Sequence, residues 1–437
     1  MKHRLITCLL VAGLVAGMAG WVHAAGFNIY EAGVRATALG GAFTATADDG
    51  SALFYNPAGL SFIEGQTVNM NFMSVAPRFK FAGAATLGGT PETAEAEHKA
   101  YFVPGAYFTK NYGGKWAWGA GVYAPFGLGV EWMNPETFVG RQVSYDVSIQ
   151  TVYVTPAVSY KVTDELAFSL GLDVALQNLK LQRYTLNPTT GDNALNTTLE
   201  GHSNVNLTPT VGAMYRPGEN VSFGMMYHHK KTMKFEGGDA TLEDASGGGS
   251  ASNYPTNLLA ALGGSEHELN SDLNLPNILS LGAAYRFTDR LAAEFNYVWF
   301  GWSTFESLAL EFDDDPDSPL NQEIHFYYED AWQVRFGLDY QMIPERMNLM
   351  AGYVYDTTPQ PLSSVSPLLP DSDRNDFSIG AEFYHGDWDF NFAYMLVVGE
   401  ERTNIENGMP ANPDPAYPVG SYKSLANILG MGVTYRF

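Results

Sequence analysis

Regular alternation of apolar and polar residues is the property that most constrains how this chain can fold. From Trp332 to Tyr340, one face would carry tryptophan, valine, phenylalanine, leucine and tyrosine, and the other glutamine, arginine, glycine and aspartate. The same alternation returns from Ala167 to Gln177 and from Leu279 to Phe287. A period of two residues is typical of β-strands with one apolar and one polar face. Its recurrence predicts an all-β fold.

The first 24 residues have the organisation of a secretory signal peptide. Lys2 and Arg4 precede an apolar run from Leu5 to Ala19, and a small-x-small site ends at Ala24. We expect cleavage after Ala24, which would also remove Cys8, the single cysteine of the chain. The mature protein would then form neither a disulfide nor a thiolate metal site. No later stretch of the sequence approaches the ~20 apolar residues that a membrane-spanning helix needs.

Composition decides which way the apolar faces point. Aromatic residues make up 14% of the chain and charged residues 16%, against about 25% charged residues in an average protein. In an outer-membrane barrel, apolar and aromatic side chains face lipid, polar ones face the lumen, and acids gather in external loops. A secreted chain whose mature part has no cysteine favours this arrangement over a soluble β-sandwich. The net charge of −23 argues separately against nucleic-acid binding. We expect a monomer in the outer membrane of a Gram-negative bacterium, inserted by the barrel-assembly machinery and surrounded by lipid and lipopolysaccharide.

Short and long connections alternate along the chain. Short turns are expected at residues 111–114, 163–165, 217–220, 288–290, 343–345 and 386–387. Longer loops are expected near 81–98, 126–147, 185–201, 236–271, 313–322, 357–374 and 399–420. Six short and seven long connections join about fourteen strands, and short periplasmic turns with long external loops are the habit of such barrels. We therefore predict an antiparallel transmembrane β-barrel of about fourteen strands over residues 66–437, closed by pairing its last strand, which ends at Phe437, with its first.

The segment before the barrel, residues 25–65, lacks the alternation and is rich in small residues. A barrel of about fourteen strands approaches the width that leaves an open channel, so we expect this segment to plug the lumen. Its Gly and Ala content would allow close packing against the wall. Pro57 favours extended backbone at Asn56, whose side chain can bridge freed backbone groups. An ordinary turn is the alternative interpretation of the Asn-Pro-Ala-Gly sequence.

Candidate ligand-binding residues come from departures in the strand pattern. Pro125 cannot donate to a strand ladder and Gly127 tolerates a bulge, so the third strand either breaks there or simply ends. Leu179 and Leu181 occupy inward positions that are polar earlier in the same strand, which a bulge or an apolar pocket would explain. Among the inward charges, most are expected to pair with one another or with the plug, and Arg335 is the first candidate to meet a ligand carboxylate.

Catalytic and metal-binding patterns are weak. The chain has no Gly-x-Ser-x-Gly sequence, and His267-Glu268 lacks the second histidine of a zinc-protease helix. His228 and His229 would point to opposite faces of a strand, and we expect a loop or interfacial role for them. We predict no enzyme, no cofactor and no metal at the site. The acidic run from Asp313 to Asp317 is expected to be a solvated loop, with a divalent-cation site bridging lipopolysaccharide as the alternative.

Several stretches together resemble the FadL family of outer-membrane transporters for long-chain fatty acids and other hydrophobic compounds. These are AGFNIYEAGVRATALGGAFTATADDGSALFYNPAGL, LPNILSLGAAYRFTDRLAAEFNYVWFGWSTFESL, DAWQVRFGLDYQ and the terminal YRF. The resemblance implies a fourteen-stranded barrel, a hatch bearing the Asn-Pro-Ala motif at Asn56, Pro57 and Ala58, an apolar internal pocket, and lateral release beside a kink in the third strand. When ligand arrives, either the whole hatch would move as a body or only its first residues, near Gly26 and Phe27, would shift.

The cargo expected from this resemblance is a long-chain fatty acid, taken up passively. An aromatic or aliphatic hydrocarbon is the nearest alternative, since both cargoes need an apolar pocket and differ mainly in one cation near the head group. A general porin, an adhesin and a barrel hydrolase remain as alternatives from other classes.

Overall fold

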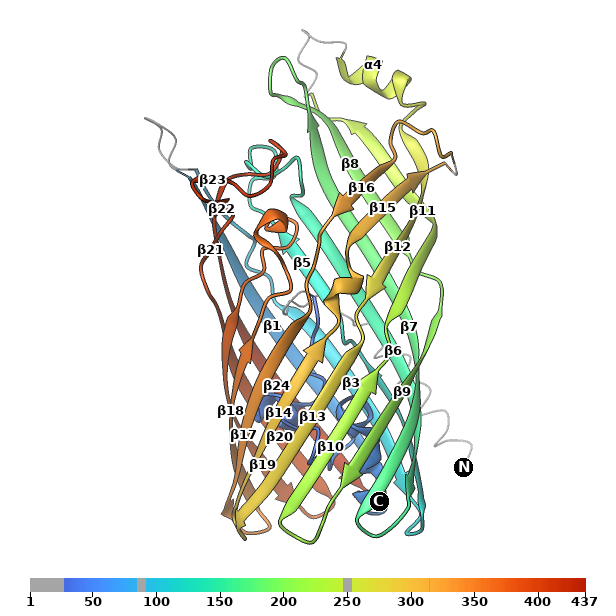
Figure 1. Cartoon of the computed structure of the whole chain (residues 1–437), viewed down its shortest axis with the longest axis vertical. Helices are drawn as coiled ribbons and strands as arrows, with labels where there is room; N and C mark the ends of the chain where they lie inside the picture. Colours follow the sequence, from blue (N-terminus) through green and yellow to red (C-terminus); the bar gives the residue numbers. More distant parts are fainter. Residues whose placement is uncertain (1–26, 85–91, 247–253, 314) are drawn as a thin grey trace.

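Fourteen antiparallel strands form a closed barrel within residues 27–84, 92–246, 254–313 and 315–437, which the computed structural model describes (Figure 1). These strands are β1 (Gln66–Gly83), β3 (Tyr101–Asn111), β4 (Trp116–Tyr123), β6 (Asp146–Lys161), β7 (Leu166–Leu186), β9 (Asn206–Tyr215), β10 (Val221–His228), β13 (Ile278–Thr288), β14 (Leu291–Phe300), β17 (Ala331–Ile343), β18 (Met347–Asp356), β19 (Arg374–His385), β20 (Trp388–Gly399) and β24 (Gly420–Arg436). The barrel closes where β1 pairs with β24, from Thr67 opposite Arg436 to Gly83 opposite Gly420. Closure leaves no barrel edge unpaired in lipid. The predicted fold class is confirmed.

The connections between these strands alternate between short and long. The described residues contain short turns after β3, β6, β9, β13, β17 and β19, and long connections after β1, β4, β7, β10, β14, β18 and β20. The short turns therefore lie at one end of the barrel, which is the periplasmic end by the habit of outer-membrane barrels.

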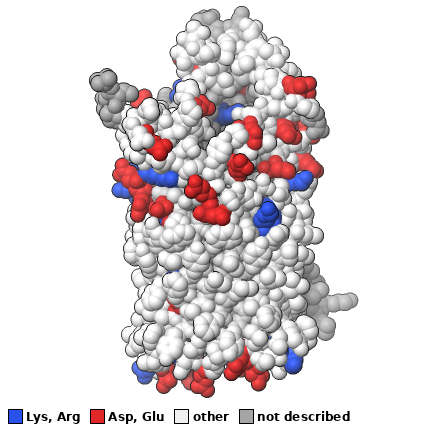
Figure 2. Space-filling view, in the orientation of Figure 1, with Lys and Arg blue, Asp and Glu red and all other residues white. Residues whose placement is uncertain are grey.

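The outer surface of the barrel carries the apolar faces of the strands. Leu170, Phe295, Ile379 and Met431 are among the large apolar side chains that remain exposed there. Figure 2 shows a broad band almost without charged residues on the face in view, between a charged lower rim and a belt of charged residues that begins near mid-height. This distribution is the one that places apolar side chains in lipid and charges in water. No helix within the described ranges is long and apolar enough to span a membrane.

On the long-loop side, the sheet extends beyond the barrel. From β7 the paired strands continue upward from the wall (Figure 1), in the order β8 (Asn193–His202), β11 (Lys231–Asp244), β12 (Glu266–Leu275), β15 (Ser307–Phe312) and β16 (Gln322–His325). The remaining short elements on this side are β2 (Thr93–Glu95), β5 (Gly127–Glu131), β21 (Arg402–Thr403), β22 (Ile405–Glu406), β23 (Met409–Pro410), α4 (Tyr254–Ala261), η2 (Trp302–Thr304) and η3 (Leu362–Ser364). The extension surrounds part of the space above the lumen.

Residues 27–63, here called the hatch segment, lie inside the barrel (Figure 1). Three short helices form there: α2 (Val34–Ala38), α3 (Ala52–Tyr55) and η1 (Pro57–Phe62). Pro57 opens η1, where its missing N–H costs nothing, and the Asn56 side chain accepts a hydrogen bond from Ala58 N. Gly40 and Gly41 follow α2 with φ of 65° and 70°, a conformation that favours glycine. The chain can therefore turn back on itself within the narrow lumen.

A belt of glycines on the lumen face of the wall brings the hatch backbone unusually close. A Cβ at Gly224 would lie 2.0 Å from Thr44 O, and one at Gly352 would lie 2.1 Å from Gly40 N. Hatch backbone atoms would also crowd a Cβ at Gly282 (Ala45 N, 2.9 Å) and Gly337 (Leu39 O, 2.8 Å), and hatch side chains would crowd one at Gly212 and Gly380. Because real Cβ contacts are never this short, only glycine at these positions allows the hatch to lie directly on the strands.

Candidate functional site

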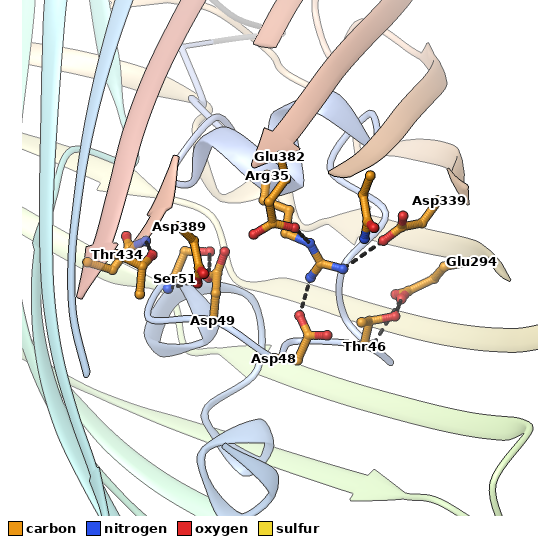
Figure 3. Close-up of polar contacts among 12 residues, drawn as sticks. Arg35, Thr46, Asp48, Asp49, Ser51, Glu294, Asp339, Glu382, Asp389 and Thr434 are labelled. Carbon is orange, nitrogen blue, oxygen red and sulfur yellow. Dashed lines mark hydrogen bonds and ion pairs between the residues drawn. The ribbon is translucent and has the colours of Figure 1, made fainter. Parts of the chain in front are cut away.

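The hatch segment is held by a guanidinium shared among three carboxylates. Arg35 of α2 donates from Nη2 to Asp339 of β17 at 2.8 Å, and its Nε lies 3.1 Å from Glu382 of β19 (Figure 3). Asp48, within the hatch itself, is the third partner. Separating α2 from the wall is costly, because a buried charge that loses its ion-pair partner is left uncompensated. Arg35 therefore connects α2 to two neighbouring parts of the wall.

A second anchor uses the free backbone groups of the hatch. Glu294 of β14 accepts hydrogen bonds from Ala45 N at 2.7 Å and from Thr46 N at 2.9 Å. The Thr46 hydroxyl also contacts this carboxylate (Figure 3). Buried carboxylates are stabilised when several N–H groups donate to them, and the inward Glu294 is thus satisfied by donors of the hatch.

The Asn-Pro-Ala motif ties the hatch to the opposite wall. Asn56 is fully buried, and its Nδ2 donates to Thr44 O at 2.9 Å and to Ala213 O of β9 at 3.0 Å. The Ser159 hydroxyl of β6 donates to Ala58 O at 3.2 Å. Both ends of the motif therefore contact barrel strands, and an isolated surface turn would not make these contacts.

The third strand of the barrel is interrupted. β4 ends at Tyr123 and β5 resumes at Gly127, and β4 pairs with β3 only as far as Val122 opposite Ala106. The start of the hatch occupies the interruption: Ile29 N donates to Pro125 O at 2.8 Å, and Gly127 N donates to Phe27 O at 2.8 Å. The hatch thus satisfies the backbone groups of Pro125 and Gly127 at the break, while Phe126 between them bonds Thr151 of β6.

An apolar cavity lies above the hatch segment. It is lined by Phe27, Leu128, Val147, Ile149, Leu179, Leu181, Leu199, Leu269, Leu273, Phe305, Leu308, Leu310, Phe326, Leu368 and Leu369. Phe27 packs edge-on against Trp302 and Phe305, with ring centroids 4.9 and 5.5 Å away. The cavity volume is about 30 Å³, little more than the space that one water molecule needs. The pocket has therefore largely closed on its own side chains.

The two leucines expected from the sequence contribute to this wall. Leu179 and Leu181 pair with Gly201 and Leu199 of β8 in an unbroken register, and they face the same cavity. The change from polar to apolar inward residues in β7 thus coincides with a pocket wall and not with a bulge. The sequence had left these two interpretations open.

Arg183, which the sequence reasoning missed, is the next inward residue of β7 beyond Leu181. Its Nη1 donates to Gln322 Oε1 of β16 at 3.0 Å, while its buried Nε has no hydrogen-bond partner in the part of the chain that the structure describes. Within the described ranges Arg183 makes no ion pair. The signal was present in the alternation, since residues 179, 181 and 183 share one face.

Arg335, the first candidate among the inward charges to meet a ligand carboxylate, contacts the hatch, which is the role expected for most of those charges. Its Nε donates to Gln333 Oε1 at 2.8 Å, its Nη1 donates to Gly41 O at 3.1 Å, and the guanidinium lies 4.4 Å from the ring centre of Tyr30. It does not contribute to the lining of the apolar cavity. The side chain thus contacts the hatch on several sides, and Gly26, the other hatch residue expected to move, lies outside the described residues.

Two further groups of titratable residues are engaged by protein partners. His228 lies between Phe54 O of the hatch, 3.2 Å from Nε2, and Asp173 of β7, 3.4 Å from Nδ1. The expected loop or interfacial role of His228 is therefore replaced by a buried contact between hatch and wall. In the acidic run, Asp313 contacts His267 Nδ1 at 2.6 Å. Within the described ranges no group of three or more metal-ligating side chains is placed to hold an ion.

Comparison with known proteins agrees with this architecture. The chain is 25% identical to Outer membrane protein P1 of Haemophilus influenzae over the full length of both, and 23% identical to the Long-chain fatty acid transport protein of Salmonella typhi over 86% of this chain and 87% of that one. A solved structure of a Pseudomonas aeruginosa FadL homologue superposes with a TM-score of 0.77 at 22% identity, covering 96% of this chain and all of the other. The Ralstonia pickettii toluene transporter TbuX gives a TM-score of 0.66 at 17% identity, with 94% and 100% covered.

A family model settles the relationship. The model described as "Outer membrane protein transport protein (OMPP1/FadL/TodX)" matches residues 15–437, nearly the whole chain. Its members are transporters and channels of the outer membrane for hydrophobic compounds, and no enzyme family is indicated. The protein therefore belongs to the OMPP1/FadL/TodX family of Gram-negative outer-membrane transporters of hydrophobic compounds.

Proposed function

We propose that this protein takes up long-chain fatty acids passively, with the hydrocarbon tail in the apolar cavity and the carboxylate at Arg183. The observation that carries the proposal is the position of Arg183. A guanidinium that has no carboxylate partner among the described residues follows directly after two leucines of an entirely apolar cavity wall. The chain has 47 acidic residues against 24 Lys and Arg, so an inward arginine left without an acid is well placed to receive one from a ligand.

A cargo with an apolar tail and a charged head group gains binding free energy from both parts of this site. Each buried CH₂ contributes about 0.8 kcal/mol on leaving water, which a cavity without polar lining can supply along the tail. A hydrogen bond to a charged group contributes roughly 1.5–3 kcal/mol. A neutral hydrocarbon would gain only the first contribution. The relatives named as fatty acid transporters support this reading, whereas the structural likeness to toluene transporters keeps aromatic hydrocarbons as the alternative cargo.

The small volume of the cavity determines how a bound ligand would enter it and be released. A tail cannot fit into about 30 Å³, so a ligand must displace part of the lining, and Phe27 is the part that belongs to the hatch. Movement of Phe27 would withdraw its carbonyl from Gly127 N and open the interruption between β4 and β5. A small cavity bordered by Ile29, Pro104 and Phe126 already lies beside this interruption. We propose lateral release there, with the Asn56-Pro57-Ala58 end of the hatch staying anchored.

Binding of radiolabelled oleate and toluene to purified variants tests this assignment. Arg183→Gln should weaken oleate binding about 10- to 150-fold, the equivalent of losing ~1.5–3 kcal/mol, and should leave toluene binding unchanged. Arg335→Gln is the matched control, because it removes the same charge from a site that contacts the hatch. A loss confined to oleate in the Arg335 variant, or an equal loss of both ligands in the Arg183 variant, would contradict the proposal.

A further inference from the structure

Gln322 and Arg183 lie at opposite ends of a curled sheet. The order from β7 through β8, β11, β12 and β15 ends at β16, and the hydrogen bond from Arg183 to Gln322 brings the last strand back to the first. The bond joins residues 139 positions apart in the sequence. It therefore links the last strand of the extension to β7 beside the apolar cavity.

The register of the hairpin determines where Gln322 points. Gln322 is paired with Leu310, which lines the apolar cavity, whereas the next residue, Glu323, is paired with Ala309 and is exposed. Paired residues of an antiparallel ladder share a face. Gln322 is thus the inward residue of β16, and Glu323 is its outward neighbour.

The contact leaves one edge of the guanidinium free. Gln322 accepts the hydrogen bond from Nη1, while Nε, on another side of the planar group, is buried and has no partner among the residues that the structure describes. A carboxylate binds guanidinium best when two parallel N–H groups face it. Holding Arg183 by Nη1 therefore preserves donors for an incoming carboxylate and limits the rotation of a long side chain with many rotamers.

We propose that Gln322 is the positioning residue for Arg183 and so determines the preference for carboxylates over neutral ligands of the same length. The inference rests on the proposed function of Arg183. Gln322 gives no charge to the site; it keeps the guanidinium preorganised, and preorganised groups lose less entropy when a ligand binds. A substitution at Gln322 consequently acts through Arg183 alone.

Equilibrium binding of oleate and methyl oleate tests the inference, because the two share one tail and differ in the charge of the head group. Gln322→Leu should weaken oleate binding about 2- to 10-fold, the range of one ordinary hydrogen bond, and leave methyl oleate binding unchanged. Gln322→Glu should weaken oleate binding further, since its carboxylate occupies Arg183. Glu323→Gln, the outward neighbour, is the matched control and should change neither.

A double variant separates this inference from the function on which it rests. In the Arg183→Gln background, Gln322→Leu should have no further effect on oleate binding. An undiminished effect there, or an equal loss of oleate and methyl oleate in Gln322→Leu, overturns the positioning role. If Arg183→Gln weakens oleate and Gln322→Leu does not, only the positioning role fails. If Arg183→Gln itself leaves oleate binding unchanged, the proposed function fails.

Discussion

Replacing Gly224 by alanine should unseat the hatch. The added Cβ would lie 2.0 Å from Thr44 O and 2.5 Å from Thr44 C, whereas ordinary contacts begin at 3.4 Å. The two segments must therefore separate by about 1.4 Å. β10 is hydrogen-bonded to β9 and β13 on its two sides, so the hatch and not the wall must move. Overpacking of this kind costs ~1–3 kcal/mol, which would raise the unseated fraction about 5- to 150-fold.

Single-channel conductance in planar bilayers measures that fraction. Gly224→Ala should open longer or more frequently than the unmodified protein, and hydrogen exchange should become faster in residues 27–63 while the barrel strands stay protected. Gly114→Ala is the control, because a Cβ there would meet no described atom within 4 Å. Unchanged conductance and unchanged exchange in Gly224→Ala would refute the view that the hatch lies directly on the glycine belt. A general porin would also show no change.

Three further results are expected. Asn56→Leu removes the amide that bridges the hatch to β9. It should raise the conductance in the same assay, because buried carbonyls left unpaired cost ~1–3 kcal/mol each. Unchanged conductance in Asn56→Leu would mean that the motif is an ordinary turn. Phe27→Ala should speed oleate association in stopped-flow experiments and lower the free energy of unfolding by ~3–5 kcal/mol. Slower association would argue against Phe27 as the side chain that the ligand displaces. The hydrogen bond from His267 lowers the pKa of Asp313 below its ordinary 3.8, so its stabilising contribution is present above about pH 4 and lost as pH falls through the lowered value; hydrogen exchange of β12 should accelerate at low pH, and Asp313→Asn should abolish that pH dependence.

The barrel was predictable because its physical cause is local. Strand faces must alternate when one side meets lipid, so segments such as Trp332–Tyr340 carry the fold in their own sequence. The glycine belt was not predictable in the same way. Gly224 and Gly352 look like ordinary lumen residues in the sequence, and their need for a missing side chain comes from hatch residues far away in the chain.

In the candidate site, too, some residues could be found from the pattern of one strand, whereas others depend on the fold around them. Leu179 and Leu181 were found because an apolar pair on a polar face is visible within one strand. Arg183 lies two residues further on the same face, but its lack of an acidic partner depends on the fold of the extension around it. Arg335 attracted attention as an inward charge, and only the structure places Gly41 and Tyr30 of the hatch against it.

A crystal structure with a fatty acid brominated at its methyl end tests the account most directly, because anomalous scattering locates one end of the ligand and density locates the other. We expect the carboxylate at Arg183, the bromine inside the apolar cavity, and the Phe27 ring displaced from Trp302 and Phe305. A carboxylate at Arg335, or bromine found only on the outer surface of the barrel, would contradict the account.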